Sequence, residues 1–281
     1  MNALWHITLF GGLCLQQAEH TITRFRTQKT ASLLSYLAYH LCQVHSREAL
    51  IDLFWSESSL ESGRASLSVA LSSLRHQLEP PGTPTHSILR ADRFSISLNP
   101  AAVATDVAEF ESAIGAASHS QNSTEREQAL ARAVERYSGH LLPNFYDDWI
   151  TGEQERLSSL FFDAVGRLIT LLEERGDFRA ALPFARKAVS MDPLREEMHF
   201  YLIRLLAAAG QMGAALRQYK EWERLLDTEL GEEPSAALRA FVRQFGKESE
   251  LSALAPSSSV TVLPTPCAAA QQTAPMTLTF L

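Results

Sequence analysis

A run of seven residues recurs in the C-terminal half of this chain after 34 positions. The run GDFRAAL at 176–182 returns as GQMGAAL at 210–216, and a leucine pair at 171–172 returns at 205–206. Each copy places a glycine before residues with helical periodicity, and small alanines where two helices can cross closely. A repeat of this length leaves each helical hairpin with an apolar face that only its neighbour can cover, so several hairpins must stack.

The length of the repeat also indicates its type. A period of 34 residues, with glycine at the turn between helices and Pro193 between units, is the signature of tetratricopeptide repeats. The sequence therefore predicts an all-α region of stacked hairpins from Thr105 onward. Its helices are expected near 151–175, 178–190, 194–209, 212–229 and 235–248, after one or two between 106 and 140.

The first hundred residues follow another pattern. Residues 5–9 alternate apolar and polar side chains, which is the period of a half-buried strand, and short strand-like segments continue to about Arg24. From residue 28 the apolar residues take helical spacing in two successive segments, and Ser46 stands as the N-cap of the second. The apolar positions of these two predicted helices are Leu33, Leu34, Leu37, Ala38, Leu41, Leu50, Ile51, Phe54 and Trp55.

A third predicted helix, at about 60–78, has two different faces. Its core face consists of Leu67, Ala70, Leu71, Leu74 and Leu78. Arg64, Ser68, Ser72 and Arg75 follow at steps of four, four and three residues, so they share the opposite side. Arginine can pair bidentately with guanine, and serine can reach bases or phosphates without steric bulk. This pattern fits a helix that enters the DNA major groove; in isolation it also fits a solvated amphipathic helix.

A hairpin completes the N-terminal segment. After the break at Pro80-Pro81-Gly82, two short strands are expected at 87–90 and 94–98. Strands, three helices and a terminal hairpin, in this order, form an OmpR-type winged helix-turn-helix. The predicted fold class is therefore mainly α, with an α+β winged helix-turn-helix before a tetratricopeptide-like all-α region.

Two segments of the N-terminal part, SREALIDLFW at 46–55 and RASLSVALSSLR at 64–75, resemble the DNA-binding domain of antibiotic-pathway regulators of the SARP class. The resemblance implies that the third helix occupies the major groove of double-stranded promoter DNA. It also implies that the hairpin, or wing, touches the adjacent backbone or minor groove. Carried over by position, the groove or phosphate contacts are Arg64, Ser66, Ser68, Ser72 and Arg75, and the wing contacts are Arg90 and Arg93.

Two positions depart from the pattern of that family. Ser73 stands where the family usually has a basic residue, and residues 91–94 read ADRF where the family has a Gly-x-Gly-Tyr-like turn. Both changes remove basic charge or turn flexibility. A modest affinity for DNA or an altered placement of the wing is therefore expected.

The C-terminal segment carries a second resemblance. The runs LLPNFYDDW at 141–149, DPLREE at 192–197 and EPS at 233–235 resemble the bacterial transcriptional activator domain, which follows the winged helix in SARP-like proteins. The resemblance implies a homodimer and contact with RNA polymerase, the latter through the loop from Ser56 to Ser59. The alternative for this region is a stabilising scaffold without a ligand.

The resulting domain prediction is a winged helix at 1–98, an activator domain at 105–249 and a flexible tail at 250–281. Residues 1–98 hold eight Lys/Arg against seven Asp/Glu, and the remainder holds 17 against 25 within a net charge of −7. The less acidic N-terminal part is weak support for a DNA-facing half. Residues 251–281 have no charged side chain, and their last six alternate like the first strand of a further domain or a frayed terminus.

The sequence lacks the common signatures of catalysis and of metal binding. It has no G-x-x-x-x-G-K-[ST] loop, no G-x-S-x-G elbow and no H-E-x-x-H helix, so we expect no enzyme, no cofactor and no metal. His40 and His45 have poor ligand spacing, and Asp147-Asp148 suits a loop acid pair. Three cysteines without C-x-x-C spacing and no bilayer-length apolar run predict a cytoplasmic protein without membrane contact.

The leading hypothesis is a sequence-specific DNA-binding transcription regulator, with activation favoured over repression. A protein-interaction adaptor that has weak or lost DNA binding is the alternative, favoured by the near-neutral N-terminal part and by Ser73. The tail alone suggests a third hypothesis, the regulatory N-terminal portion of a larger signalling enzyme.

Overall fold

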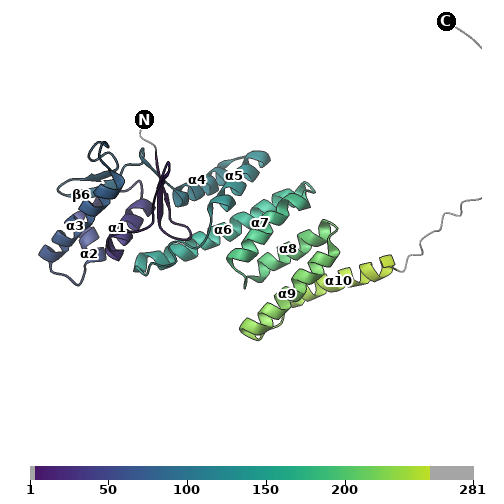
Figure 1. Cartoon of the computed structure of the whole chain (residues 1–281). Coiled ribbons are helices and arrows are strands. Elements are labelled where there is room, and N and C mark those ends of the chain that lie inside the picture. Colours follow the sequence, from purple (N-terminus) through teal and green to yellow (C-terminus); the bar gives the residue numbers. More distant parts are fainter. Residues whose placement is uncertain (1–3, 254–281) are drawn as a thin grey trace, which may run out of the picture. The chain divides into compact units, whose positions relative to one another are not determined.

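The computed structural model describes residues 4–253 (Figure 1). The predicted fold class is confirmed: a small α+β winged helix-turn-helix precedes an all-α region of helical hairpins. Residues up to Ser235 form one compact unit, whereas α10 (Ala236–Ala253) belongs to a second unit and is described by itself.

A four-stranded sheet with the order β3-β2-β1-β7 begins the chain. Its strands are β1 (Trp5–Thr8), β2 (Cys14–Gln17), β3 (His20–Ile22) and β7 (Val103–Thr105). β1 runs antiparallel to β2 but parallel to β7, so Trp5 lies opposite Val103. The sequence pattern predicts the first three strands but does not indicate β7, because a three-residue strand carries too little periodicity.

Three helices follow the first three strands of this sheet, as predicted: α1 (Gln28–Tyr39), α2 (Arg47–Phe54) and α3 (Leu60–Leu78). A side-chain oxygen caps each N-terminus by accepting a backbone N–H, which satisfies a donor that the helix leaves free. The caps are Thr27 for Thr30, the predicted Ser46 for Ala49, and Ser59 for Ser62. The C-terminus of α3 is tied to the sheet, because the Trp5 indole Nε1 donates to the carbonyl of Leu78 at 3.1 Å.

The wing is a three-stranded sheet with the order β4-β6-β5. β5 (Leu89–Ala91) and β6 (Ser95–Leu98) form the antiparallel hairpin predicted at 87–90 and 94–98. β4 (His45–Ser46), a strand that the sequence pattern does not indicate, adds to β6 immediately before α2. This pairing fixes the wing to the first residues of the helix-turn-helix.

Antiparallel helices make up the rest of the first unit (Figure 1). They are α4 (Asp106–His119), α5 (Ser123–Arg136), α6 (Asp148–Glu174), α7 (Phe178–Met191), α8 (Glu196–Ala208) and α9 (Met212–Leu230). Each lies close to its expected range, and each packs against the next one along the chain.

The two repeat units have the same turn. Gly176 and Gly210 both take a left-handed backbone, with φ of 74° and 76°, which glycine adopts without the steric cost of a side chain. The N–H of Asp177 donates to the carbonyl of Leu172 at 2.9 Å, and the equivalent bond from Gln211 to Leu206 is 2.8 Å. The 34-residue sequence period therefore corresponds to a repeat of hydrogen bonds.

The sheet and the helices share a core. Phe10 lies against Phe110 and Tyr137, with ring centroids 5.6 and 4.6 Å apart. The carboxylate of Asp106 accepts the backbone N–H groups of Leu9 and Phe10 at 2.9 and 3.0 Å. Burial raises the pKa of Asp106 to about 6, even though these N–H groups favour the charged form.

Extensive contacts therefore cross the expected boundary between 1–98 and 105–249, and the exact limits of the domains stay a prediction. The first residues of the expected 250–281 tail belong to α10. The remainder of that tail, including its strand-like last residues, lies outside the described residues.

Candidate nucleic-acid interface

The side of α3 that faces away from the core is open. The predicted core residues of α3 are buried against α1, α2 and β5. Its exposed positions in the same stretch include Arg64, Ala65, Ser68, Val69, Ser72 and His76. The sequence patterns miss Ala65, Val69 and His76, although their spacing of four and seven residues places them on one helical face with Ser72. A methyl-bearing side chain such as that of Val69, which is 49% exposed, can contact a thymine methyl group.

Arg64 is a solvent-exposed arginine of α3. Its side chain is 58% exposed, and its Nη2 lies 3.8 Å from a carboxylate oxygen of Glu48, which is itself 75% exposed. A pair of this separation and exposure contributes little, because water screens both charges. The guanidinium group of Arg64 is therefore available to an external acceptor.

The serines of α3 are placed differently from one another. Ser68 donates its hydroxyl to the carbonyl of Arg64 at 2.8 Å, so its oxygen remains available as an acceptor. Ser72 is exposed on the same side, whereas Ser66 is half-buried at the edge of the face. The structure thus brings Arg64, Ser68 and Ser72 together and leaves Ser66 at the margin.

Arg75 connects α3 to the wing. Its Nη2 lies 3.5 Å from the carbonyl of Ala91 in β5 and 3.4 Å from Nδ1 of His86. Its Nε is buried without a hydrogen-bond partner among the described residues. These contacts place Arg75 between the helix and the hairpin, so its geometry suits a residue that positions the wing.

An aspartate closes the turn at the tip of the wing. One carboxylate oxygen of Asp92 accepts the N–H groups of Phe94 and Ser95, both at 2.7 Å, and these bonds lower the pKa of Asp92. Arg47 holds the turn from the side of α2: its Nε donates to the Asp92 carbonyl at 2.9 Å and its N–H to the Phe94 carbonyl at 3.0 Å. The turn is thereby fixed without the glycines expected there.

The tip presents two arginines and an aromatic ring. Arg90 and Arg93 are exposed, and the guanidinium carbon of Arg93 lies 5.6 Å from the ring centre of Phe94. Phe94 is 74% exposed. The sequence patterns miss Arg47 and Phe94 as site residues; the position of Arg47 directly after the Ser46 cap is the signal that could have indicated it.

Residues considered for metal binding have structural partners instead. His40 and His45 belong to a ring cluster with Tyr36 and Trp149, and burial lowers the pKa of both imidazoles. Asp147 accepts the hydroxyl of Ser32 at 2.7 Å. Across residues 4–253 there is no group of three His, Cys, Asp or Glu side chains placed to hold a metal ion.

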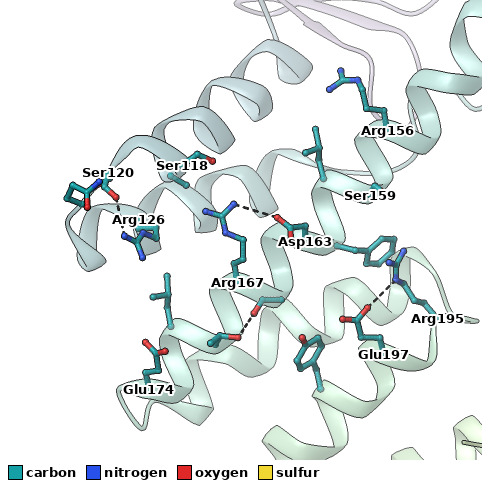
Figure 2. A pocket seen from close by; sticks show the side chains of 18 residues that line it. Ser118, Ser120, Arg126, Arg156, Ser159, Asp163, Arg167, Glu174, Arg195 and Glu197 are labelled. Carbon is teal, nitrogen blue, oxygen red and sulfur yellow. Dashed lines mark hydrogen bonds and ion pairs between the residues drawn. The ribbon is translucent and has the colours of Figure 1, made fainter.

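A second concave site lies in the helical region. A hollow of about 980 Å³ is bordered by the α4–α5 turn, by α6 and by the start of α8 (Figure 2). Four arginines line it: Arg126, Arg156, Arg167 and Arg195. No sequence pattern indicates this hollow, because its lining residues, from Ala117 to Tyr201, lie up to 84 positions apart.

Comparisons with known proteins agree with this architecture. The family described as "Transcriptional regulatory protein, C terminal" matches residues 25–92, and the "Bacterial transcriptional activator domain" matches residues 105–244. No match was found among the curated proteins. In the part of the chain that the structure describes, no helix combines the length and apolarity needed to cross a bilayer.

Among solved structures with a similar fold is that of EmbR from Mycobacterium tuberculosis, in complex with a low-affinity phosphopeptide. The TM-score is 0.60 and the sequence identity 21%, over 88% of this chain and 66% of that one. The chain thus spans just under two thirds of the length of that neighbour. The two matched families stand in the order of an OmpR-type winged helix and an activator domain, and by this order the chain belongs to the SARP-like regulators.

Proposed function

We propose that this protein is a sequence-specific DNA-binding transcription regulator of the activating kind. One observation carries the proposal: the outward face of α3 is exposed beside an exposed wing in a chain with SARP-like domain order. In this proposal the protein acts on promoter DNA, and its location in a bacterial cell is therefore the cytoplasm.

In this proposal α3 enters the major groove. Arg64 pairs with a base or a phosphate, Ser68 and Ser72 contact the neighbouring bases or phosphates, and Val69 packs on a thymine methyl group. The wing reaches the adjacent backbone or minor groove through Arg90 and Arg93. Arg75 acts through the wing, because its contacts run to Ala91 and His86.

Binding of the full chain to duplex sites selected from a random library tests the proposal. Affinity should fall steeply between low and high salt, because phosphate contacts release counterions. Arg64→Ala should weaken binding by about 1–3 kcal/mol and relax the preference at one base position. Arg179→Ala, a change of an exposed arginine on α7, serves as the control and should leave binding unchanged. Selection of no sequence, or equal binding by Arg64→Ala, would contradict the proposal.

The adaptor alternative retains one supporting observation. Residues 1–98 are close to electrically neutral, and Glu48 lies beside Arg64, so the α3 face is less basic than a strong DNA-binding surface. A titration at low salt separates the two functions. An adaptor shows the same weak affinity for every duplex, whereas a regulator prefers its selected site at least a thousandfold over random DNA.

We also infer that the protein acts as a homodimer and contacts RNA polymerase. Residues 56–59, which precede α3, are exposed and provide a surface next to the DNA face. Sedimentation of the full chain with and without its site tests the dimer. Transcription in vitro with Glu57→Ala tests the polymerase contact, since this change should reduce activation while leaving DNA affinity intact.

A further inference from the structure

The hollow in the helical region is elongated. Its wall on α6 runs from Arg156 to Glu174, and the rise of an α-helix makes this wall about 27 Å long. An extended peptide of about eight residues covers that distance. A ligand that contacts the whole wall therefore has the length of a peptide segment.

Two arginines of this hollow, Arg126 and Arg167, each have one internal partner among the described residues. Arg126 donates to the carbonyl of Ser120 at 3.2 Å, and Arg167 lies 3.5 Å from a carboxylate oxygen of Asp163. Figure 2 shows the side chains of Arg126 and Arg167 extending into the space between the α4–α5 turn and α6. Each guanidinium group carries five N–H donors, so most of this donor capacity is unused.

The guanidinium group of Arg195 is held in an orientation that suits a bidentate pair with a carboxylate. Its guanidinium carbon lies 4.2 Å from the ring centre of Phe162, and its Nε lies 3.8 Å from Glu197. A planar guanidinium group that rests on a ring loses less freedom when it forms a bidentate pair, which makes the pair stronger. Arg195 therefore presents a preorganised fork at the α8 end of the hollow.

Three exposed acidic side chains line the hollow, Asp163, Glu174 and Glu197, and two of them pair with its arginines at small cost of separation. The side chains of Asp163 and Glu197 are 63% and 56% exposed, so water solvates them when their partner turns towards a ligand. Arg156 differs, because Glu111, Glu153 and Tyr39 already surround its guanidinium group. It forms a closed end of the hollow, and Arg126, Arg167 and Arg195 are the groups that remain for a ligand.

We propose that this hollow binds an extended acidic peptide segment of a partner protein, whose Asp or Glu carboxylates pair with Arg126, Arg167 and Arg195. Guanidinium groups on α5, on α6 and before α8 require a ligand with several carboxylates along its length. Apolar lining from Leu160 and Leu171 accepts the intervening side chains. Residues 99–235, which belong to the same unit as the hollow, hold 14 Lys/Arg against 23 Asp/Glu, so most of this region repels an acidic peptide and only the cluster of arginines attracts it.

Fluorescence anisotropy of labelled octapeptides with the full chain tests the proposal. The probes alternate Asp or Glu with Leu or Ala, and matched probes carry Asn or Gln instead. We expect the acidic set to bind at least tenfold more tightly than the amide set. Arg167→Gln and Arg195→Gln should each weaken binding of the acidic set at least tenfold. Arg179→Gln, on α7 outside the hollow, should have no effect.

Three results would overturn the proposal: equal binding of acidic and amide probes, an equal loss in Arg179→Gln, or no binding of any probe. Competition by inorganic phosphate as strong as that of the peptide would overturn it as well, since it would indicate a site for a single anion. Displacement of the peptide by duplex DNA would reassign the arginines to nucleic acid. The measurement of DNA binding by the α3 variants is independent of all these outcomes. Failure of the peptide proposal therefore leaves the proposed DNA-binding function unaffected.

Discussion

At the scale of single residues, two arginines of one helix have different surroundings. Arg64 faces solvent beside an exposed glutamate, whereas Arg75 reaches across to the hairpin. Both belong to the same run of positions in the sequence, and both are expected there to contact DNA. Their surroundings give them different roles within the proposed function: Arg64 contacts DNA bases, and Arg75 positions the wing.

Replacing Arg75 tests this division. Arg75→Ala removes the contacts to Ala91 and His86, so the wing loses its support from α3. We expect weaker binding to every duplex by a similar factor, with an unchanged base preference, whereas Arg64→Ala alters the preference at one position. Repeating the site selection with both variants is the measurement. A changed base preference in Arg75→Ala would instead make it a residue that reads DNA.

The sequence predicts much of this site but not its fine placement. Burial of Leu67, Leu71 and Leu74 follows from helical periodicity and is confirmed. The position of Arg75 does not follow, because a long side chain at the edge of a helix turns towards whatever lies beside it. That neighbour is a hairpin strand 16 residues later. The support of the wing turn by Arg47 escapes prediction for the same reason.

At the scale of elements, α2 and α3 cross at a glycine. A Cβ atom added to Gly63 would lie 2.6 Å from Cγ2 of Ile51, which is closer than van der Waals contact allows. The two helices of the helix-turn-helix can therefore approach only because position 63 has no side chain. Their crossing sets the direction in which the exposed face of α3 points.

Gly63→Ala should destabilise the protein by about 1–3 kcal/mol, because the methyl group forces α3 away from Ile51. Urea unfolding of the full chain measures the loss. Gly115→Ala in α4 is the matched control, since nothing lies within 4 Å of its added Cβ, and there the better helix propensity of alanine should stabilise slightly. Equal stability of Gly63→Ala and the unchanged chain would show that the helices can separate freely.

The packing of α8 against α9 makes stability depend on pH. His199 stacks on Trp222 with ring centres 4.2 Å apart, and its Nε2 donates to the carbonyl of Pro193 at 2.9 Å. Burial lowers the pKa of His199, so the folded protein keeps the ring neutral. The unfolded chain takes up this proton as pH falls through about 6.5. Stability should therefore fall on acidification through that range and be retained above it.

His199→Phe tests this dependence because it preserves the stack and removes the titration. The free energy of unfolding should change less between pH 7.5 and 5.5 in this variant than in the unchanged chain. His76→Phe on the exposed face of α3 provides the control. An identical pH profile for His199→Phe and the unchanged chain would exclude His199 as a source of acid sensitivity.

The helices and five of the seven strands in the described residues are predicted, whereas β4 and β7 are not. Helices α6 to α9 each carry several turns of apolar periodicity, so their local pattern is sufficient. β4 and β7 have two and three residues, and pairing with distant strands determines them. The local sequence of residues 103–105 holds no information about a partner strand at the other end of the winged segment.

At the scale of the first unit, a polar network joins the winged helix-turn-helix to the helical region. The hydroxyl of Tyr39 on α1 contacts Glu153 on α6, and Arg156 donates to Tyr39 at 2.9 Å while also pairing with Glu111 on α4. Ser32 and Asp147 add a second link between α1 and the segment before α6. The helix that supports α3 from behind is thus itself held by the activator region.

Tyr39→Phe should lower the stability of the full chain by about 1 kcal/mol, because Glu153 and Arg156 lose a shared hydrogen-bond partner. Thermal unfolding followed by tryptophan fluorescence measures this, since Trp149 lies against Tyr39 with ring centres 5.3 Å apart. Tyr146→Phe, where the tyrosine is 91% exposed, is the control. Unaltered stability of Tyr39→Phe would mean that this network does not stabilise the packing of the winged helix-turn-helix against the helical region.

The parallel pairing of β1 with β7 determines when the N-terminal sheet can be completed during synthesis. β1 leaves the ribosome before β7, which emerges only after the entire wing, and Leu142, which donates its N–H to the Leu9 carbonyl at 2.9 Å, emerges later still. Until then one edge of the nascent sheet stays unpaired, which exposes it to aggregation. A truncation between the two matched family segments would consequently leave the N-terminal sheet incomplete. An exchange of winged helix-turn-helix domains among such regulators therefore requires that the first helices of the activator segment be transferred together with the domain.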